Sequence, residues 1–158
     1  MRLELQGVSA RVGAHTHLYP TSVSLMAGAI NVLLGPTLAG KTTLMRLMAG
    51  LDRPTEGKIF ADGVDVTGVP VRERHLAMVY QQFINYPSLS VFENIASPLR
   101  IAGKLSEGDI RKKVHEMADR LHIANYLDRS PAALSGGQQQ RTALARALIK
   151  DAGWFLLD

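Results

Sequence analysis

Cysteine is absent from this chain of 158 residues, which excludes a disulfide framework, a thiolate metal site and a cysteine nucleophile. Aromatic residues make up only 6%, and no apolar run approaches the roughly 20 residues that span a bilayer. The N-terminus alternates charged with apolar residues and lacks the apolar stretch of a signal peptide, so the reducing cytoplasm is the expected compartment. The formal net charge of +4 is small and indicates no nucleic-acid partner.

The rest of the composition is globular, with 46% hydrophobic and 20% charged residues, and the length predicts about one domain. Alternating apolar residues predict a half-buried strand over 2–8, and a nearly continuous apolar run predicts a strand buried on both faces over 29–34. Further strands are predicted at 23–25, 58–61, 64–66, 75–80 and 154–157, with a tight turn at Asp62 and Gly63. Helices are predicted at 41–49, from Ser106 to Leu121, and around 143–148. This order indicates an α/β fold with a mostly helical insertion from about 87 to 150.

A glycine-rich loop lies between the predicted strand at 29–34 and the predicted helix at 41–49, and it fits the pattern G-x-x-x-x-G-K-S/T. Its glycines allow a tight bend, and its successive N–H groups form an anion nest at the positive end of the helix. Lys41 brings a compact cation to the β and γ phosphates, Thr42 a hydroxyl to Mg²⁺, and Thr43 a donor to the α phosphate. The motif predicts a bound nucleoside triphosphate with Mg²⁺. The predicted contacts are Gly35, Pro36, Thr37, Leu38, Ala39, Gly40, Lys41, Thr42 and Thr43.

A second glycine-containing stretch, Leu134 to Arg141, opens the predicted helix around 143–148. A serine and two glycines before a helix make another N-terminal anion site. One domain that holds one triphosphate has little use for two such sites, so the second is expected to serve a triphosphate on another subunit. The predicted contacts are Ser135, Gly136, Gly137 and Gln138.

Over its whole length the chain resembles the nucleotide-binding subunit of ATP-binding cassette (ABC) transporters. Four motifs in the expected order carry the resemblance: Walker A at 35–43, the Q-loop at Tyr80-Gln81-Gln82, the LSGGQ signature at 134–141, and Walker B at 154–158. The resemblance implies a P-loop NTPase core (RecA-like) with an N-terminal antiparallel β subdomain and a helical insertion, incomplete at the C-terminus. The implied division is 1–86 for the β subdomain with Walker A and the Q-loop, 87–150 for the helical subdomain, and 151–158 for the Walker B strand.

The same resemblance implies a Mg²⁺-dependent ATPase. Gln81 matches the glutamine that reaches Mg²⁺ and the attacking water, and Asp158 matches the aspartate that holds Mg²⁺. The implied catalytic residues are Lys41, Gln81 and Asp158, and the implied metal-binding residues are Thr42, Gln81 and Asp158. Two subunits are expected to close head-to-tail around two ATP molecules, each site pairing the phosphate loop of one with the signature of the other.

The implied partners are therefore a second ATPase subunit, transmembrane permease subunits and, indirectly, a periplasmic solute-binding protein, at the cytoplasmic face of the inner (plasma) membrane. The stretches 78–94 and 127–131 are similar to carbohydrate importers of the maltose type. The loop interior, Thr37 to Ala39, resembles that of glycerol or polyol importers. Import of a sugar, glycerol or another polyol is the expected function. The solute itself, and whether the second ATPase is a twin or a relative, stay open.

The chain departs from the family pattern at its end and at the adenine position. It stops at Asp158, just before the family's catalytic glutamate, D-loop and switch histidine, so these residues alone are expected to bind ATP weakly and hydrolyse it negligibly. Val12 stands where family members stack adenine on an aromatic ring; either Tyr19 substitutes or adenine is held loosely. Stacking on an aromatic is worth about 1–3 kcal/mol per base in nucleic-acid sites.

Two other functions stay open from the sequence: a soluble ABC ATPase without a membrane partner, and a non-catalytic member of a paired ATPase. A small GTPase is disfavoured because the guanine-reading Asn-Lys-x-Asp motif is missing. Arg141 and Arg146, which follow the signature, are expected to form local salt bridges rather than to contact nucleotide.

Overall fold

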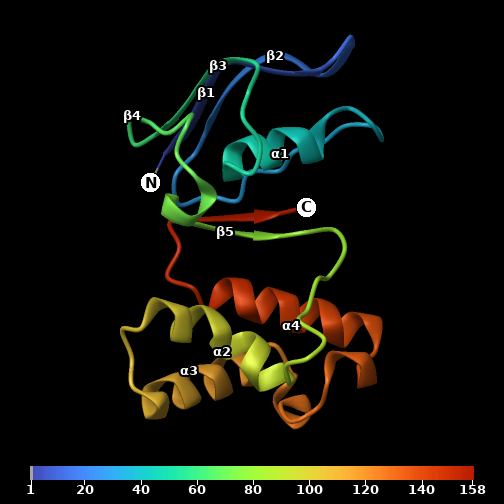
Figure 1. Ribbon diagram of the computed structural model, residues 1–158, viewed down its shortest axis with the longest axis vertical. Coiled ribbons are helices and arrows are strands. Elements are labelled where there is room, and N and C mark those ends of the chain that lie inside the picture. The colour runs from blue at the N-terminus through green and yellow to red at the C-terminus, as the bar shows by residue number, and fades with distance from the viewer. Residues whose placement is uncertain (1) are drawn as a thin grey trace. The chain divides into compact units, whose positions relative to one another are not determined.

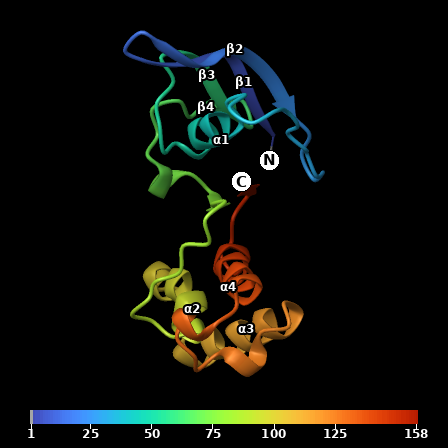
Figure 2. The same cartoon turned by 90° about the vertical axis from the view of Figure 1, so that its right-hand side faces the viewer.

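The computed structural model describes residues 2–158, and the chain divides into two compact units, residues 1–76 and 77–158 (Figure 1). The first unit holds a four-stranded sheet in the order β2-β1-β3-β4, in which each strand runs antiparallel to its neighbours. Helix α1 lies beside this sheet in both views (Figures 1 and 2). The elements of the unit are β1 (Leu3–Val12), β2 (His15–Leu25), α1 (Lys41–Ala49), β3 (Glu56–Ala61), β4 (Val64–Asp65) and the 3-10 turn Val71–Glu73.

Local sequence signals explain most of this unit. Leu3 and Leu5 are buried while Gln6 is exposed, which confirms the predicted alternation on β1. Asp62 and Gly63 have φ of 48° and 81°, the positive values that a two-residue hairpin turn requires, so the predicted hairpin between β3 and β4 is confirmed. The predicted helix begins at Lys41 and ends at Ala49, before Gly50.

The strand predicted at 29–34 is wrong. The segment has no regular secondary structure, and Ile30, Val32 and Leu34 are 92%, 72% and 85% exposed. An extended apolar segment becomes a strand only when neighbouring strands pair with its N–H and C=O groups, and none of the four strands of this unit does so. The apolar composition indicated burial but carried no information about a partner.

Arg74 ties the end of α1 to the loop before β5 from a buried position. Its guanidinium donates to backbone carbonyls, and burial lowers the pKa of this group. The five acceptors are the carbonyl oxygens of Leu47, Met48, Val66, Thr67 and Val69. Gly50 must lack a side chain here, since a Cβ would lie 2.4 Å from the Arg74 Nε.

Replacing Arg74 with methionine is expected to destabilise the protein by about 2–4 kcal/mol. The carbonyls of Leu47 and Val66 keep backbone N–H donors, so only part of the contact is left unsatisfied, and each buried carbonyl left without a donor costs about 1–3 kcal/mol. Urea unfolding of the full-length protein measures this loss. Arg72→Met is the matched control: this side chain is 82% exposed, and its loss should change stability by less than about 0.5 kcal/mol. Equal midpoints for the two variants would show that Arg74 does not anchor α1.

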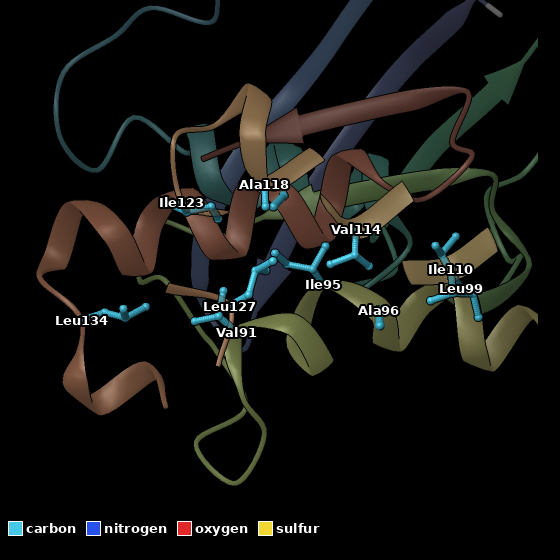
Figure 3. Close-up of a cluster of buried hydrophobic side chains, with 11 residues drawn as sticks. Val91, Ile95, Ala96, Leu99, Ile110, Val114, Ala118, Ile123, Leu127 and Leu134 are labelled. Carbon is cyan, nitrogen blue, oxygen red and sulfur yellow. The ribbon is translucent and has the colours of Figure 1, made fainter. Parts of the chain in front are cut away.

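The second unit combines helices with a two-stranded sheet formed by β5 and β6, whose arrows run in the same direction (Figure 1). Its elements are β5 (Leu76–Val79, whose first residue closes the first unit), α2 (Val91–Ala102), α3 (Glu107–Arg120), α4 (Gly136–Leu148), β6 (Trp154–Leu157) and the 3-10 turns Ala124–Tyr126 and Pro131–Ala133. The three helices pack around one buried apolar cluster that includes Ile95, Val114 and Leu134 (Figure 3). Between residues 2 and 158, no helix is long and apolar enough to cross a membrane.

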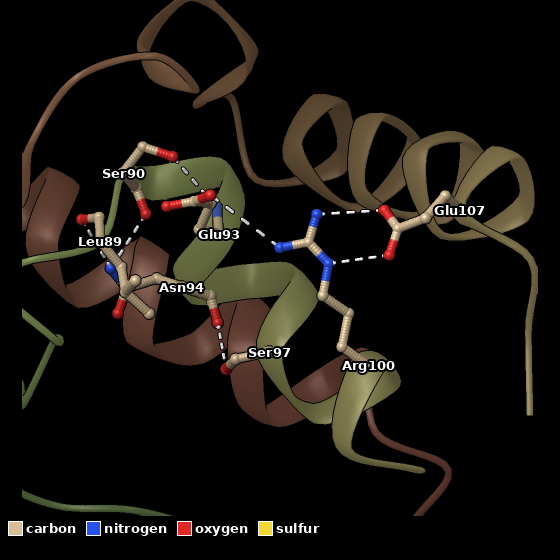
Figure 4. A network of polar contacts seen from close by, with 7 residues as sticks. All are labelled: Leu89, Ser90, Glu93, Asn94, Ser97, Arg100 and Glu107. Carbon is tan, nitrogen blue, oxygen red and sulfur yellow. Dashed lines mark hydrogen bonds and ion pairs between the residues drawn. The ribbon is translucent and has the colours of Figure 1, made fainter. Parts of the chain in front are cut away.

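The predicted strand at 154–157 is confirmed, and Ser106 caps α3 by accepting from the Asp109 N–H at 3.1 Å, also as predicted. Helix α2 was not predicted. Its signals were Ser90, which accepts from the Glu93 N–H, and Gly103 at its end with φ of 63°. Pro98 inside the helix obscured the pattern because proline has no N–H. The Ser97 hydroxyl donates to the Asn94 carbonyl at 2.9 Å, the acceptor that residue 98 would otherwise use (Figure 4).

Candidate nucleotide-binding site

The phosphate loop of the first unit leads directly into α1. Residues 35–39 are exposed, and α1 starts at Lys41 with neither a side-chain cap nor an acidic residue in its first turn. The positive end of this helix is therefore not neutralised by a carboxylate of its first turn, which fits an anionic ligand. The loop joins irregular backbone to a helix, where the sequence predicted a strand before it.

Gly40 fixes the end of the loop against β2. Its φ of 86° lies in the left-handed region, and a Cβ added there would come within 2.7 Å of the His17 carbonyl oxygen and 3.3 Å of Leu18 Cδ1. Only glycine satisfies both conditions. The close approach of backbone to backbone holds the start of α1 beside β2.

Lys41 lies over the same loop. Its Nζ donates to the carbonyl oxygens of Gly35 at 2.9 Å and Pro36 at 2.8 Å. An ammonium group has three donors, so these two bonds leave capacity for an anion. The exposed loop, the uncapped helix start and the lysine together fit the phosphates of a nucleotide. Thr42 is exposed and Thr43 half-buried at the first turn.

Leu38 is a strained position in this loop. It has φ of 67° and is 97% exposed, so it lacks packing that would offset the left-handed backbone. Leu38→Val is expected to weaken triphosphate binding by about fivefold, since a β-branched residue at positive φ costs about 1 kcal/mol more. Leu38→Gly should bind at least as tightly as the original chain. Titration with a fluorescent nucleotide measures the affinity of both variants. Equal affinities of Leu38→Val and Leu38→Gly would show that the loop does not bind nucleotide in this conformation.

The signature segment starts α4 in the second unit. Ser135 Oγ accepts from the Gln138 N–H at 3.4 Å, and Gln138 Oε1 accepts from the Ser135 N–H at 2.9 Å, a capping box. Ser135, Gly136 and Gly137 are exposed, and a Cβ on either glycine would meet nothing within 4 Å. The helix start is therefore open to another molecule. The Gln138 amide oxygen, in contrast, is turned toward its own helix.

Gln81 and Asp158 lie at the same end of the β5–β6 pair. The Asp158 N–H donates to the Val79 carbonyl at 3.0 Å, and Gln81 follows Val79 by two residues with an exposed side chain. Each unit thus holds one set of predicted residues: 35–43 in the first, and Gln81, Asp158 and 135–138 in the second. The two candidate adenine positions, Val12 and Tyr19, are 68% and 75% exposed in the first unit.

The salt bridges expected for Arg141 and Arg146 are wrong in the described part of the chain, where neither pairs with a carboxylate. Arg146 instead lies over the Tyr86 ring at 4.6 Å and donates to the Ile84 carbonyl and to Asn94 Oδ1. Burial lowers the pKa of its guanidinium. This contact was not predicted, because its partners lie more than 50 residues away along the chain.

The phosphate loop, the antiparallel sheet and the helical unit define a P-loop NTPase fold of the ATP-binding cassette type. The cassette MJ0796, solved as a dimer in a post-hydrolysis state bound to ADP and Pi, matches with a TM-score of 0.88 and 29% identity, covering 99% of this chain and 73% of that chain. A family model described as ABC transporter matches residues 18–158. The chain therefore belongs to the ABC transporter family, in which ATP and Mg²⁺ are the nucleotide and the ion, as the sequence predicted.

Similar curated proteins are importer subunits. The spermidine/putrescine import ATP-binding protein PotA of Nitrosospira multiformis is 42% identical, covering 99% of this chain and 43% of the relative. The sn-glycerol-3-phosphate import ATP-binding protein UgpC 1 of Rhizobium johnstonii is 40% identical, covering 99% and 42%. Others of comparable identity are named for sulfate/thiosulfate and Fe(3+) import. The chain spans less than half the length of these relatives, and import is what their names share.

Proposed function

We propose that this chain is the ATP-binding and ATP-hydrolysing part of a subunit that energises solute import through an ABC transporter. One observation carries the proposal: a single chain holds both an exposed phosphate loop with Lys41 above it and a second, open helix start at 135–137. One site binds a triphosphate, and the other is free to face the triphosphate of a second subunit. The importer names of the relatives support the direction of transport.

The chemistry follows from positioning and charge rather than from a covalent step. Lys41 and the N–H groups of residues 35–43 bind the phosphates. Thr42, Gln81 and Asp158 are the residues that would hold Mg²⁺, which would neutralise phosphate charge. The Gln81 amide orients the attacking water. The capping box leaves the Ser135 hydroxyl hydrogen able to donate, and Gln138 contributes through its amide nitrogen.

The working unit in this proposal is a pair of subunits arranged head-to-tail at the cytoplasmic face of the inner membrane. The exposure of both 35–39 and 135–137 supports the pairing, as does the dimeric state of the MJ0796 structure. Permease subunits receive the motion, and a periplasmic solute-binding protein acts through them. In this proposal, residues 1–86 form the β subdomain with Walker A and the Q-loop, 87–150 the helical subdomain, and 151–158 the Walker B strand.

For the solute, we propose a sugar, glycerol or another polyol. The loop interior, Thr37 to Ala39, and the likeness to a glycerol-phosphate importer subunit support this choice. The test restores the full-length gene to cells that lack it and measures uptake of labelled glycerol, glycerol-3-phosphate, maltose, putrescine and sulfate. Restored uptake of glycerol, its phosphate or maltose is expected. Restored uptake of putrescine or sulfate alone would contradict the proposed solute but not the proposed ATPase activity. Purified protein that hydrolyses no Mg-ATP would contradict the proposed ATPase activity.

A further inference from the structure

The segment 84–90, which follows Gln81 by three residues, is fastened to α2 by a fully buried side chain, Asn94. Asn94 Oδ1 accepts from the Tyr86 N–H at 2.8 Å. Its Nδ2 shares its two hydrogens among the carbonyl oxygens of Tyr86 at 3.0 Å, Leu89 at 3.1 Å and Ser90 at 3.0 Å, the last two drawn in Figure 4. One amide thus binds the middle and the end of the segment and holds this part of its backbone in a single arrangement.

The same segment is also fastened to α4, the helix that begins with the signature. Arg146 reaches from α4 to the Ile84 carbonyl, to Asn94 Oδ1 at 3.3 Å and to the face of Tyr86. Asn85 Nδ2 donates to the Gln139 carbonyl of the first α4 turns at 3.0 Å. Arg146 is the side chain that joins all three parts: the segment, the amide that fixes it, and α4.

The side chains of Gln81 and its neighbour Gln82 differ from this anchored segment. Both side chains are exposed, and in the described part of the chain neither makes a hydrogen bond. The short link that carries them runs from Val79 at the end of β5 to Ile84, the carbonyl that Arg146 binds. The position of Gln81 is therefore set from one side by β5 and from the other by the Arg146 contact.

We propose that Arg146 is a positioning residue for Gln81. By binding the Ile84 carbonyl it attaches the residues that follow Gln81 to α4, so that α4 sets where the Gln81 amide lies. The inference rests on the proposed function, in which Gln81 orients the attacking water. The contacts of Arg146 are to Ile84, Asn94 and Tyr86, which are not predicted nucleotide contacts, so its loss should impair the hydrolytic step and spare the binding of ATP by residues 35–43.

The test measures steady-state ATP hydrolysis by the full-length protein assembled with its permease partner. Arg146→Ala is expected to lower kcat by at least about tenfold and to leave KM for ATP within about twofold, the pattern of a lost transition-state interaction. Arg146→Lys should recover part of kcat, because an ammonium can bond Ile84 but lacks the planar fork that serves Asn94 and Tyr86 together. Arg100→Ala is the matched control, since this arginine forms exposed ion pairs with Glu93 and Glu107 in the same unit and should keep the original kcat (Figure 4).

An Arg146→Ala protein with the kcat of Arg100→Ala would overturn the proposal, and so would a raised KM with unchanged kcat. If Arg146→Ala does not fold, Arg146→Lys and Asn85→Ala decide: a lowered kcat with unchanged KM in both supports the proposal, and original kcat in both overturns it. An original protein that hydrolyses no ATP contradicts the proposed function instead, so the two failures are distinguishable.

Discussion

Replacing Lys41 with alanine is expected to abolish ATP binding by the full-length protein, a loss of at least about a hundredfold in affinity. Its ammonium lies over the 35–43 loop, bonded to the Gly35 and Pro36 carbonyls. The bonds to Gly35 and Pro36 leave one donor for phosphate, and a hydrogen bond from a charged donor contributes about 1.5–3 kcal/mol, a factor of up to about 100. Loss of the two bonds that hold the loop adds to this effect. Filter binding with labelled ATP measures the affinity directly.

Lys58→Ala is the matched control for this experiment. Lys58 belongs to the same unit, and its ammonium pairs with Asp65 on the exposed surface at 3.3 Å, so its removal should leave ATP affinity unchanged. Lys41 also bonds the Gly35 and Pro36 carbonyls, so Lys41→Ala removes two contacts that hold the loop as well as the cation. Lys41→Arg separates the two causes, because it retains charge and donors but not the compact geometry. ATP affinity in Lys41→Ala equal to that in Lys58→Ala would contradict the phosphate-loop assignment.

The elements that the sequence predicted correctly depend on neighbouring residues. Gly50 ends α1 because the next residue after Ala49 must take a positive φ, observed at 75°. Asp62 and Gly63 close their hairpin by the same kind of local requirement. In contrast, the segment 29–34 needed a strand partner, which its own residues do not specify. Helix α2 was missed because Pro98 interrupts its pattern and Ser97 compensates through a side chain.

The candidate site also has a part that the sequence predicts and a part that it does not. The motifs around Lys41 and Ser135 are predictable because backbone N–H groups and a helix start bind anions within a few neighbouring residues. The Arg146 contact could not be predicted, because its acceptors are a backbone carbonyl 62 residues away and the amide of Asn94. A carbonyl carries no residue identity, so no sequence pattern marks the position to which an arginine will bond.

Replacing Ser135 with arginine is expected to leave ATP binding to each subunit intact and to block ATP-driven dimerisation. Ser135 is exposed at the open start of α4, next to two glycines with free space around them. If this surface meets the nucleotide of a second subunit, a long cation there prevents close approach of the backbone. Residues at the centre of an interface contribute about 2 kcal/mol or more, so the dimer dissociation constant should rise by at least about thirtyfold.

The control must reproduce the loss of a helix cap, because Ser135→Arg removes one, at a cost of about 1 kcal/mol in stability. Ser106→Arg does so: Ser106 caps α3 in the same unit and is exposed, but it belongs to no predicted nucleotide contact. Light scattering of the full-length protein with ATP and no added Mg²⁺ measures dimerisation without turnover. Dimers formed by Ser106→Arg but not by Ser135→Arg place the second anion site at the subunit interface. Dimers formed equally by both variants would mean that the signature serves the chain's own fold, leaving the phosphate loop as its one nucleotide contact.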